Sequence, residues 1–131
     1  MTTASPLWRV AAVAWAAVIF VSGVIPTQST VHAISGGHDS LATTIGHFMA
    51  YVALGFLLGV AFSGWRVDTG RLMLGLALAA ALGGAIELVQ GPLSYRDAQV
   101  VDFVVDVAGA GVGLVLFSAV TSVTRPRSRP G

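Results

Sequence analysis

Four long apolar stretches follow one another along the chain, separated by short segments in which polar residues gather. They cover Leu7–Ile25, Leu41–Phe62, Leu72–Gln90 and Val100–Val120. Each comes close to the length of about 20 apolar residues that a helix needs to cross a bilayer. In lipid the backbone of such a segment must satisfy its own hydrogen bonds, which favours helices. The pattern therefore predicts an all-α fold: a four-transmembrane-helix bundle in a polytopic integral membrane protein.

Composition supports this prediction. Of the 131 residues, 55% are hydrophobic and only 10% are charged, and the mean hydropathy is +0.82. These values lie far outside the range of soluble globular domains. The chain fits one transmembrane domain over residues 1–124, followed by a basic tail at 125–131. It has no cysteine, which excludes disulfides and thiolate metal sites.

The arginines predict an orientation. All seven basic residues are arginine, and with four spans six of them share one side of the membrane, leaving only Arg96 on the other. By the positive-inside rule, both termini and the Gly64–Arg71 loop should face the cytoplasm of a bacterial cell. Trp8 and Trp65 then lie at the inner interface and Tyr95 at the outer one. The first stretch reaches Ile25 without a nearby Ala-x-Ala site, so we interpret it as a retained helix rather than a signal peptide.

The tail is the only basic cluster, formed by Arg125, Arg127 and Arg129. It is typical of a polybasic segment attracted to anionic lipid, at about 1 kcal/mol per arginine near the surface. We therefore predict a membrane partner and no nucleic-acid partner.

Acidic residues gather in one part of this apolar chain. Residues 87–113 hold four of the six acids. An acid inside a membrane-length apolar segment is costly to desolvate, so it is by default a candidate functional residue. The predicted topology brings the polar groups of three helices to a similar depth near the outer face. The candidate polar cluster consists of His47, Tyr51, Glu87, Gln90, Arg96, Asp102 and Asp106.

Small residues follow or precede these polar positions at the helical spacing of three or four residues. On the second helix His47 and Tyr51 are followed by Gly55 and Gly59, and on the fourth Asp102 and Asp106 lead toward Gly109 and Gly113. Gly75, Ala79, Gly83 and Glu87 form the corresponding stripe of the third helix. Such ridges allow membrane helices to approach closely, which predicts that the polar residues face inward. The alternative is that the glycines serve packing alone and the acids face a wet surface.

Several chemical roles are open to the cluster. Arg96 is the obvious counter-charge for the three carboxylates, and its guanidinium can pair two oxygens of a carboxylate or a phosphate. His47 can equally well be a hydrogen-bond partner of Glu87 or Tyr51 across a helix interface. Asp97 is most simply the N-cap of the fourth helix, and Asp39 or Ser40 that of the second. The positions of His47, Glu87 and Asp106 in the sequence match no recognised spacing of metal ligands. We therefore predict no metal and no cofactor.

These residues resemble the VanZ-like family of small bacterial membrane proteins. The family pattern has a block His-Phe-x-x-Tyr-x-x-Leu-Gly, which matches His47 to Gly55. A second block has Glu-x-x-Gln, then Arg, then Asp-x-x-x-Asn-x-x-Gly. It corresponds here to Glu87, Gln90, Arg96, Asp102, Asp106 and Gly109. The chain departs from the family at Asp106, where asparagine is usual, and at Thr43 and Thr44, where Asp-Lys is common.

The resemblance implies a cell-envelope setting, because the founding member is associated with low-level resistance to teicoplanin. The leading hypothesis is that the polar cluster recognises a lipid head group or a lipid-linked envelope precursor and thereby influences glycopeptide susceptibility. One alternative is a membrane-embedded hydrolase or transferase with Glu87 or Asp106 as general base and Arg96 as phosphate clamp. No serine, cysteine or metal signature near the cluster supports it, and catalytic residues are not assigned. The other alternative is a small proton-coupled transporter that uses Glu87, although its site should lie nearer the membrane midplane.

Overall fold

Four helices account for most of the described chain. The structure is a computed structural model that describes residues 5–25, 39–92 and 100–124. Its helices are α1 (Pro6–Val24), α3 (Asp39–Ser63), α4 (Thr69–Gln90) and α5 (Val100–Thr124). All four are long and apolar enough to cross a membrane, and the described residues contain no strand. The predicted all-α bundle of a multi-pass membrane protein is therefore confirmed.

Capping explains where two of the helices begin. The Ser5 hydroxyl accepts a hydrogen bond from the Leu7 amide at 3.3 Å, and Pro6 occupies the first turn of α1, where its missing N–H costs nothing. The Asp68 carboxylate accepts from the Arg71 amide at 3.0 Å. This cap starts α4 at Thr69, so the predicted start at Leu72 was wrong by one turn.

The ends of α3 and α5 also differ from the predicted bounds. α3 runs from Asp39 through Ser63, and Gly64 follows with a φ of 60°, the left-handed conformation that commonly ends a helix. α5 continues past the predicted end at Val120 to Thr124. Its Ser122 hydroxyl donates to the Ser118 carbonyl at 2.7 Å, so the polar residues of this last turn are accommodated within the helix.

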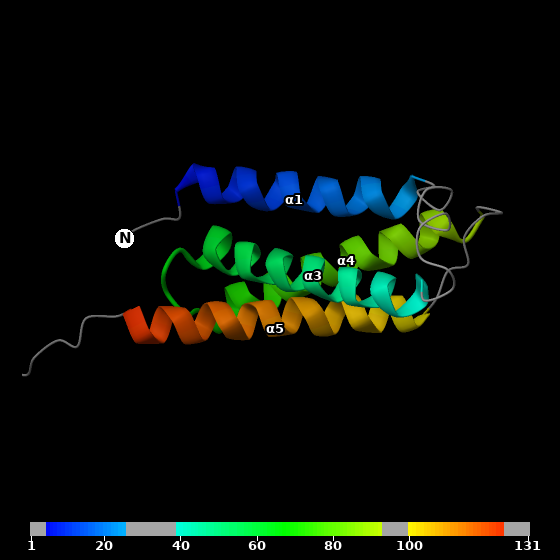
Figure 1. The fold of residues 1–131 in the computed structure, drawn as a ribbon. Helices are drawn as coiled ribbons and strands as arrows, with labels where there is room; N and C mark the ends of the chain where they lie inside the picture. Colours follow the sequence, from blue (N-terminus) through cyan, green and yellow to red (C-terminus); the bar gives the residue numbers. More distant parts are fainter. Residues whose placement is uncertain (1–4, 26–38, 93–99, 125–131) are drawn as a thin grey trace, which may run out of the picture.

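α3 lies at the centre of the bundle and packs against each of the other three helices (Figure 1). Its contact with α5 is the most extensive, and glycines of both helices allow the close approach. A β-carbon on Gly109 would lie 2.6 Å from the Phe48 carbonyl oxygen, and one on Gly59 would lie 2.7 Å from the Phe117 ring. At Gly55 and Gly113 the added atom would overlap the backbone of the facing helix. The two backbones are therefore in direct contact, as the predicted small-residue ridges require.

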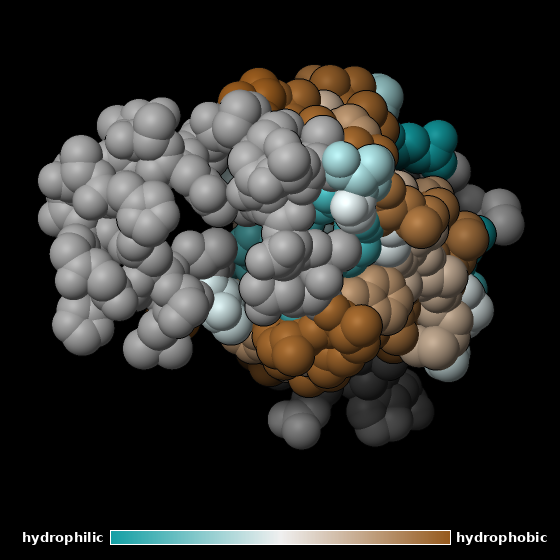
Figure 2. All heavy atoms as spheres, turned by 90° about the vertical axis from the view of Figure 1, so that its right-hand side faces the viewer, coloured by the Kyte–Doolittle hydropathy of each residue, from teal (hydrophilic) through white to brown (hydrophobic). Residues whose placement is uncertain are grey.

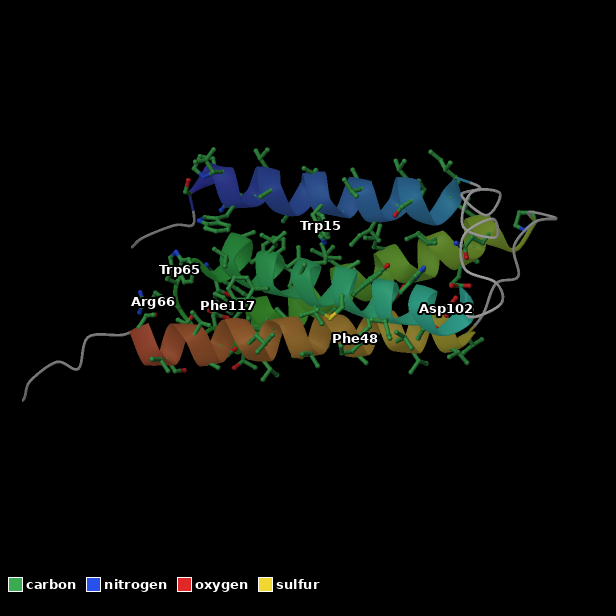
Figure 3. All side chains as sticks on the ribbon, viewed as in Figure 1. Trp15, Phe48, Trp65, Arg66, Asp102 and Phe117 are labelled. Atoms are coloured by element: carbon green, nitrogen blue, oxygen red, sulfur yellow. The ribbon has the colours of Figure 1, made fainter. Side chains whose placement is uncertain are left out.

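The bundle has two chemically different ends. The start of α1, the α3–α4 turn and the end of α5 lie together at what we call the Trp65 end, on the left in Figures 1 and 3. There Trp8 and Trp65 make an edge-to-face ring contact with centroids 6.0 Å apart. The opposite end, where Asp102 lies in Figure 3, is called the Asp102 end. Halfway along, the Trp15 indole donates to the Ala50 carbonyl at 2.9 Å and fixes α1 to α3.

The orientation of this bundle remains a prediction, and reporter fusions test it. Fusions after Trp65 and after Arg125 should read cytoplasmic, and a fusion at Ser35 should read extracytoplasmic, because six arginines lie on one side against one on the other. A cytoplasmic signal at Ser35 would place the Asp102 end in the cytoplasm and contradict the predicted sidedness.

Candidate functional site

A histidine and an aspartate from two helices meet at the centre of the candidate site. His47 Nδ1 on α3 lies 3.4 Å from Asp106 Oδ1 on α5, an ion pair when the imidazole is protonated. Their side chains are 23% and 4% exposed. Asp106 is the most deeply buried acid that the structure describes, and it reaches this position because Gly109, one turn away, lets α5 approach α3 closely.

A tyrosine completes this buried group. The Tyr51 hydroxyl and Asp106 Oδ2 each lie 3.3 Å from the place that a β-carbon would take on Gly83. Gly83 of α4 thus leaves room for the polar side chains of α3 and α5. Within the described residues, neither the Tyr51 hydroxyl nor Asp106 Oδ1 has a hydrogen bond of good geometry. An unsatisfied buried polar atom costs about 1–3 kcal/mol, so Asp106 Oδ1 is stabilised by His47 Nδ1 beside it, and the Tyr51 hydroxyl is stabilised by the neighbouring Asp106 carboxylate.

A small cavity adjoins this group between α1, α3 and α4. Its volume is about 110 Å³, and its polar lining comes from Ser22, His47 and Tyr51. Ser22 is a residue that the sequence analysis missed, because it was counted only as part of an apolar span. Its hydroxyl donates to the Ile19 carbonyl at 3.0 Å, the ordinary hydrogen bond of a serine within a helix. Ser22 is therefore not arranged as an activated nucleophile.

Glu87 lies near Tyr51 and also lines a groove on the other side of α4 from the small cavity. This half-buried residue shares the groove, of about 560 Å³ between α4 and α5, with Gly84, Leu88, Gly91, Val100 and Phe103. The groove is otherwise apolar. Leu88 and Val100 are 81% and 79% exposed, so the groove opens toward the surroundings of the bundle at the Asp102 end. Figure 2, which looks onto this end, shows hydrophilic surface between hydrophobic patches.

Gln90 has a structural partner. Its side-chain amide is buried and donates to the Gly23 carbonyl at 2.7 Å, near the C-terminal end of α1, where such carbonyls lack helical partners. The sequence placed Gln90 in the polar cluster. In the structure it connects α4 to α1, a contact that no spacing within the sequence indicates.

We expect Gln90→Leu to lower the free energy of unfolding of the purified protein in detergent by about 1 kcal/mol, a value within the range for hydrogen bonds between membrane helices. Val89→Leu, on the exposed side of the same turn, is the control and should behave like wild type. If Gln90→Leu kept full stability but lost bound lipid, Gln90 would belong to the ligand site instead.

The other candidate residues lie toward the helix ends or outside the described part. Asp102 is half-buried in the first turn of α5, one turn beyond Asp106, where a negative charge is favoured by the helix dipole. Several predicted residues fall outside the described part of the chain: Tyr95, Arg96, Asp97 and the tail at 125–131. The side chains of Asp39, Ser40 and Thr43 are also outside it. No three His, Cys, Asp or Glu side chains within the described ranges come together as a metal site.

Comparison with known proteins identifies one family. The VanZ/LLP1 family model matches residues 8–121, a range that covers most of each of the four helices. No curated protein and no solved structure matches the chain.

Proposed function

The chain belongs to the VanZ/LLP1 family, and on this premise we propose that its Asp102 end recognises the head group of a lipid or of a lipid-linked envelope precursor. In this arrangement the Asp102 end lies at the outer face of the bacterial cell membrane. Recognition there alters how much precursor is accessible to glycopeptides such as teicoplanin, and so changes glycopeptide susceptibility.

One observation carries the proposal: the groove between α4 and α5 combines an apolar wall with a single carboxylate. Phe103 and Leu88 provide hydrophobic surface for an acyl or prenyl chain, and Glu87 lies within the same lining. The groove volume of about 560 Å³ falls within the usual range of ligand pockets, about 300–1,000 Å³. An amphiphile fits such a surface, with its chain along the groove and its head group at the end of the helices.

The chemistry of Glu87 limits the part of the head group that it contacts. A carboxylate accepts hydrogen bonds from ammonium, amide and sugar hydroxyl groups, and it repels a phosphate. Arg96, which follows α4 in the sequence, is the proposed partner of the phosphate, because guanidinium pairs phosphate oxygens in a bidentate manner. A ligand carrying both a phosphate and hydrogen-bond donors would satisfy both residues.

The other two hypotheses gain less support. A hydrolase or transferase requires a nucleophile or an activated water, and the hydroxyl of Ser22, on the cavity beside His47, is held by Ile19. A proton-coupled transporter should have its acid near the midplane of the membrane. Glu87 instead lies one turn from the C-terminal end of α4.

Gly84 and Glu87, which both line the groove, allow a direct test in cells. A β-carbon on Gly84 would lie 3.8 Å from Phe103, an ordinary contact, so Gly84→Leu should fill the groove without disturbing the core. We expect Gly84→Leu and Glu87→Gln to reduce the effect of the protein on teicoplanin susceptibility. For Glu87→Gln the loss of a hydrogen bond to a charged group predicts about a tenfold or greater fall in ligand affinity.

Gly111→Leu provides the matched control, because a β-carbon on Gly111 would meet nothing within 4 Å. Membrane abundance of every variant is measured in parallel. Wild-type susceptibility in both Gly84→Leu and Glu87→Gln, at normal abundance, would exclude the α4–α5 groove as the functional surface.

A further inference from the structure

A second groove lies between α1 and α4, and it is independent of the proposed function. Its volume is about 320 Å³. α1 contributes Ala12, Val13 and Ala16 to one wall, Leu78 of α4 forms the other, and Leu58, Ala61 and Phe62 of α3 form the floor. Val13 and Leu78 are 70% and 43% exposed, so the groove opens sideways, toward the lipid around a membrane-spanning bundle.

The only charged residue in this lining is Arg9, in the first turn of α1. Within the described residues, Arg9 forms no hydrogen bond or ion pair with another side chain. The nearby arginine of α4, Arg71, is already engaged, since it donates to the Phe62 carbonyl at 2.8 Å and pairs with Asp68 at 3.7 Å. Arg9 thus provides a positive charge at one end of an apolar groove.

The depth of Arg9 is that of a lipid head group. It follows Trp8, which contacts Trp65 at the same end of the bundle, and tryptophans of membrane proteins concentrate at the level of the head groups. Figure 3 shows Trp65 and Arg66 together at this end. Among the described residues, this end carries the three arginines Arg9, Arg66 and Arg71 and a single acid, Asp68. The charge is therefore complementary to an anionic ligand.

We propose that this groove binds one chain of an anionic phospholipid, with the lipid phosphate on Arg9. The volume of about 320 Å³ is at the lower limit of ligand pockets, which suits a single acyl chain better than a whole lipid. The chain lies along Ala12, Val13 and Ala16, where small side chains leave space beside the helix. The site lies at the opposite end of the molecule from Glu87 and requires no ligand there.

Native mass spectrometry with added lipid tests this assignment. The protein is titrated in detergent with phosphatidylglycerol and, separately, with phosphatidylcholine of the same acyl chains. Arg9→Gln should lower the preference for phosphatidylglycerol by about fivefold, the contribution of one arginine near a membrane surface. Arg66→Gln removes an equal charge from the exposed turn and should leave the preference as in wild type. Arg9→Lys should keep most of it.

A second pair of variants tests the groove itself. Val13→Phe places a ring in the groove and should weaken binding of both lipids, whereas Val10→Phe, on an exposed position of α1 outside the lining, should not. An unchanged lipid preference in Arg9→Gln would overturn the proposal, and so would equal effects of the two phenylalanines. A dimer that disappears with Val13→Phe would assign the groove to a second copy of the chain and would overturn it too. Because Glu87→Gln leaves Arg9 untouched, loss of the proposed head-group recognition would not alter these results.

Discussion

Gly113→Ala should unfold at a clearly lower temperature than wild type, whereas Gly111→Ala, two residues away on the same helix, should be equally or slightly more stable. A β-carbon on Gly113 would overlap the Val52 carbonyl and come within 2.8 Å of the Phe56 amide nitrogen. Both are backbone atoms of α3, which cannot move aside as a side chain can. α5 would therefore have to shift, and overpacking of this kind typically costs about 1–3 kcal/mol or more.

Gly111 is the matched control because its β-carbon would meet nothing. Alanine is more favourable than glycine inside a helix by about 0.5–1 kcal/mol, so the two variants should change stability in opposite directions. Thermal unfolding of the purified proteins in one detergent measures both. Equal stability of the two variants would contradict the direct backbone contact between α3 and α5.

Arg96→Ala should greatly reduce function or abundance, and more so than Arg66→Ala. Glu87 and Asp102 are half-buried, and Asp106 is 3% exposed. Acids withdrawn from water this far need a counter-charge, and Arg96 is the arginine that the sequence places between α4 and α5. Arg66 lies in an exposed turn at the opposite end, where removal of a charge costs little.

Asp106→Asn tests whether uncompensated negative charge causes the defect of Arg96→Ala. It restores the residue usual in the family pattern and removes one buried negative charge, so it should be tolerated alone and should partly rescue Arg96→Ala. Membrane abundance and teicoplanin susceptibility are compared for the single and double variants. Arg96→Ala with wild-type values in both measurements would contradict a charge-balanced cluster.

The helices and their inner faces could be predicted from the sequence because both follow from periodic patterns. Length and hydropathy predict spans, and the spacing of Gly55, Gly109 and Gly113 predicts which sides approach closely. The helix ends were less predictable, because local hydrogen bonds such as the Asp68 cap decide where a helix begins.

The arrangement within the site could be predicted only in part. The sequence indicated that His47 and Asp106 come from inward-facing stripes, but it could not show that Gln90 binds the Gly23 carbonyl. That contact depends on where α1 lies against α4, and α1 carries no polar pattern that fixes its position. The one available signal was Trp15, since an indole N–H in the middle of a span needs an acceptor, here the Ala50 carbonyl.

Mass spectrometry of the lipids that remain bound to the purified wild-type protein and to Gly84→Leu tests head-group recognition at the α4–α5 groove directly. Wild type and Gly111→Leu should both carry a lipid or lipid-linked precursor with a phosphate and hydrogen-bond donors. Gly84→Leu should lose it, while other lipids, including any held near Arg9, stay bound. The same lipids in the same amounts on wild type and Gly84→Leu would contradict recognition at the α4–α5 groove.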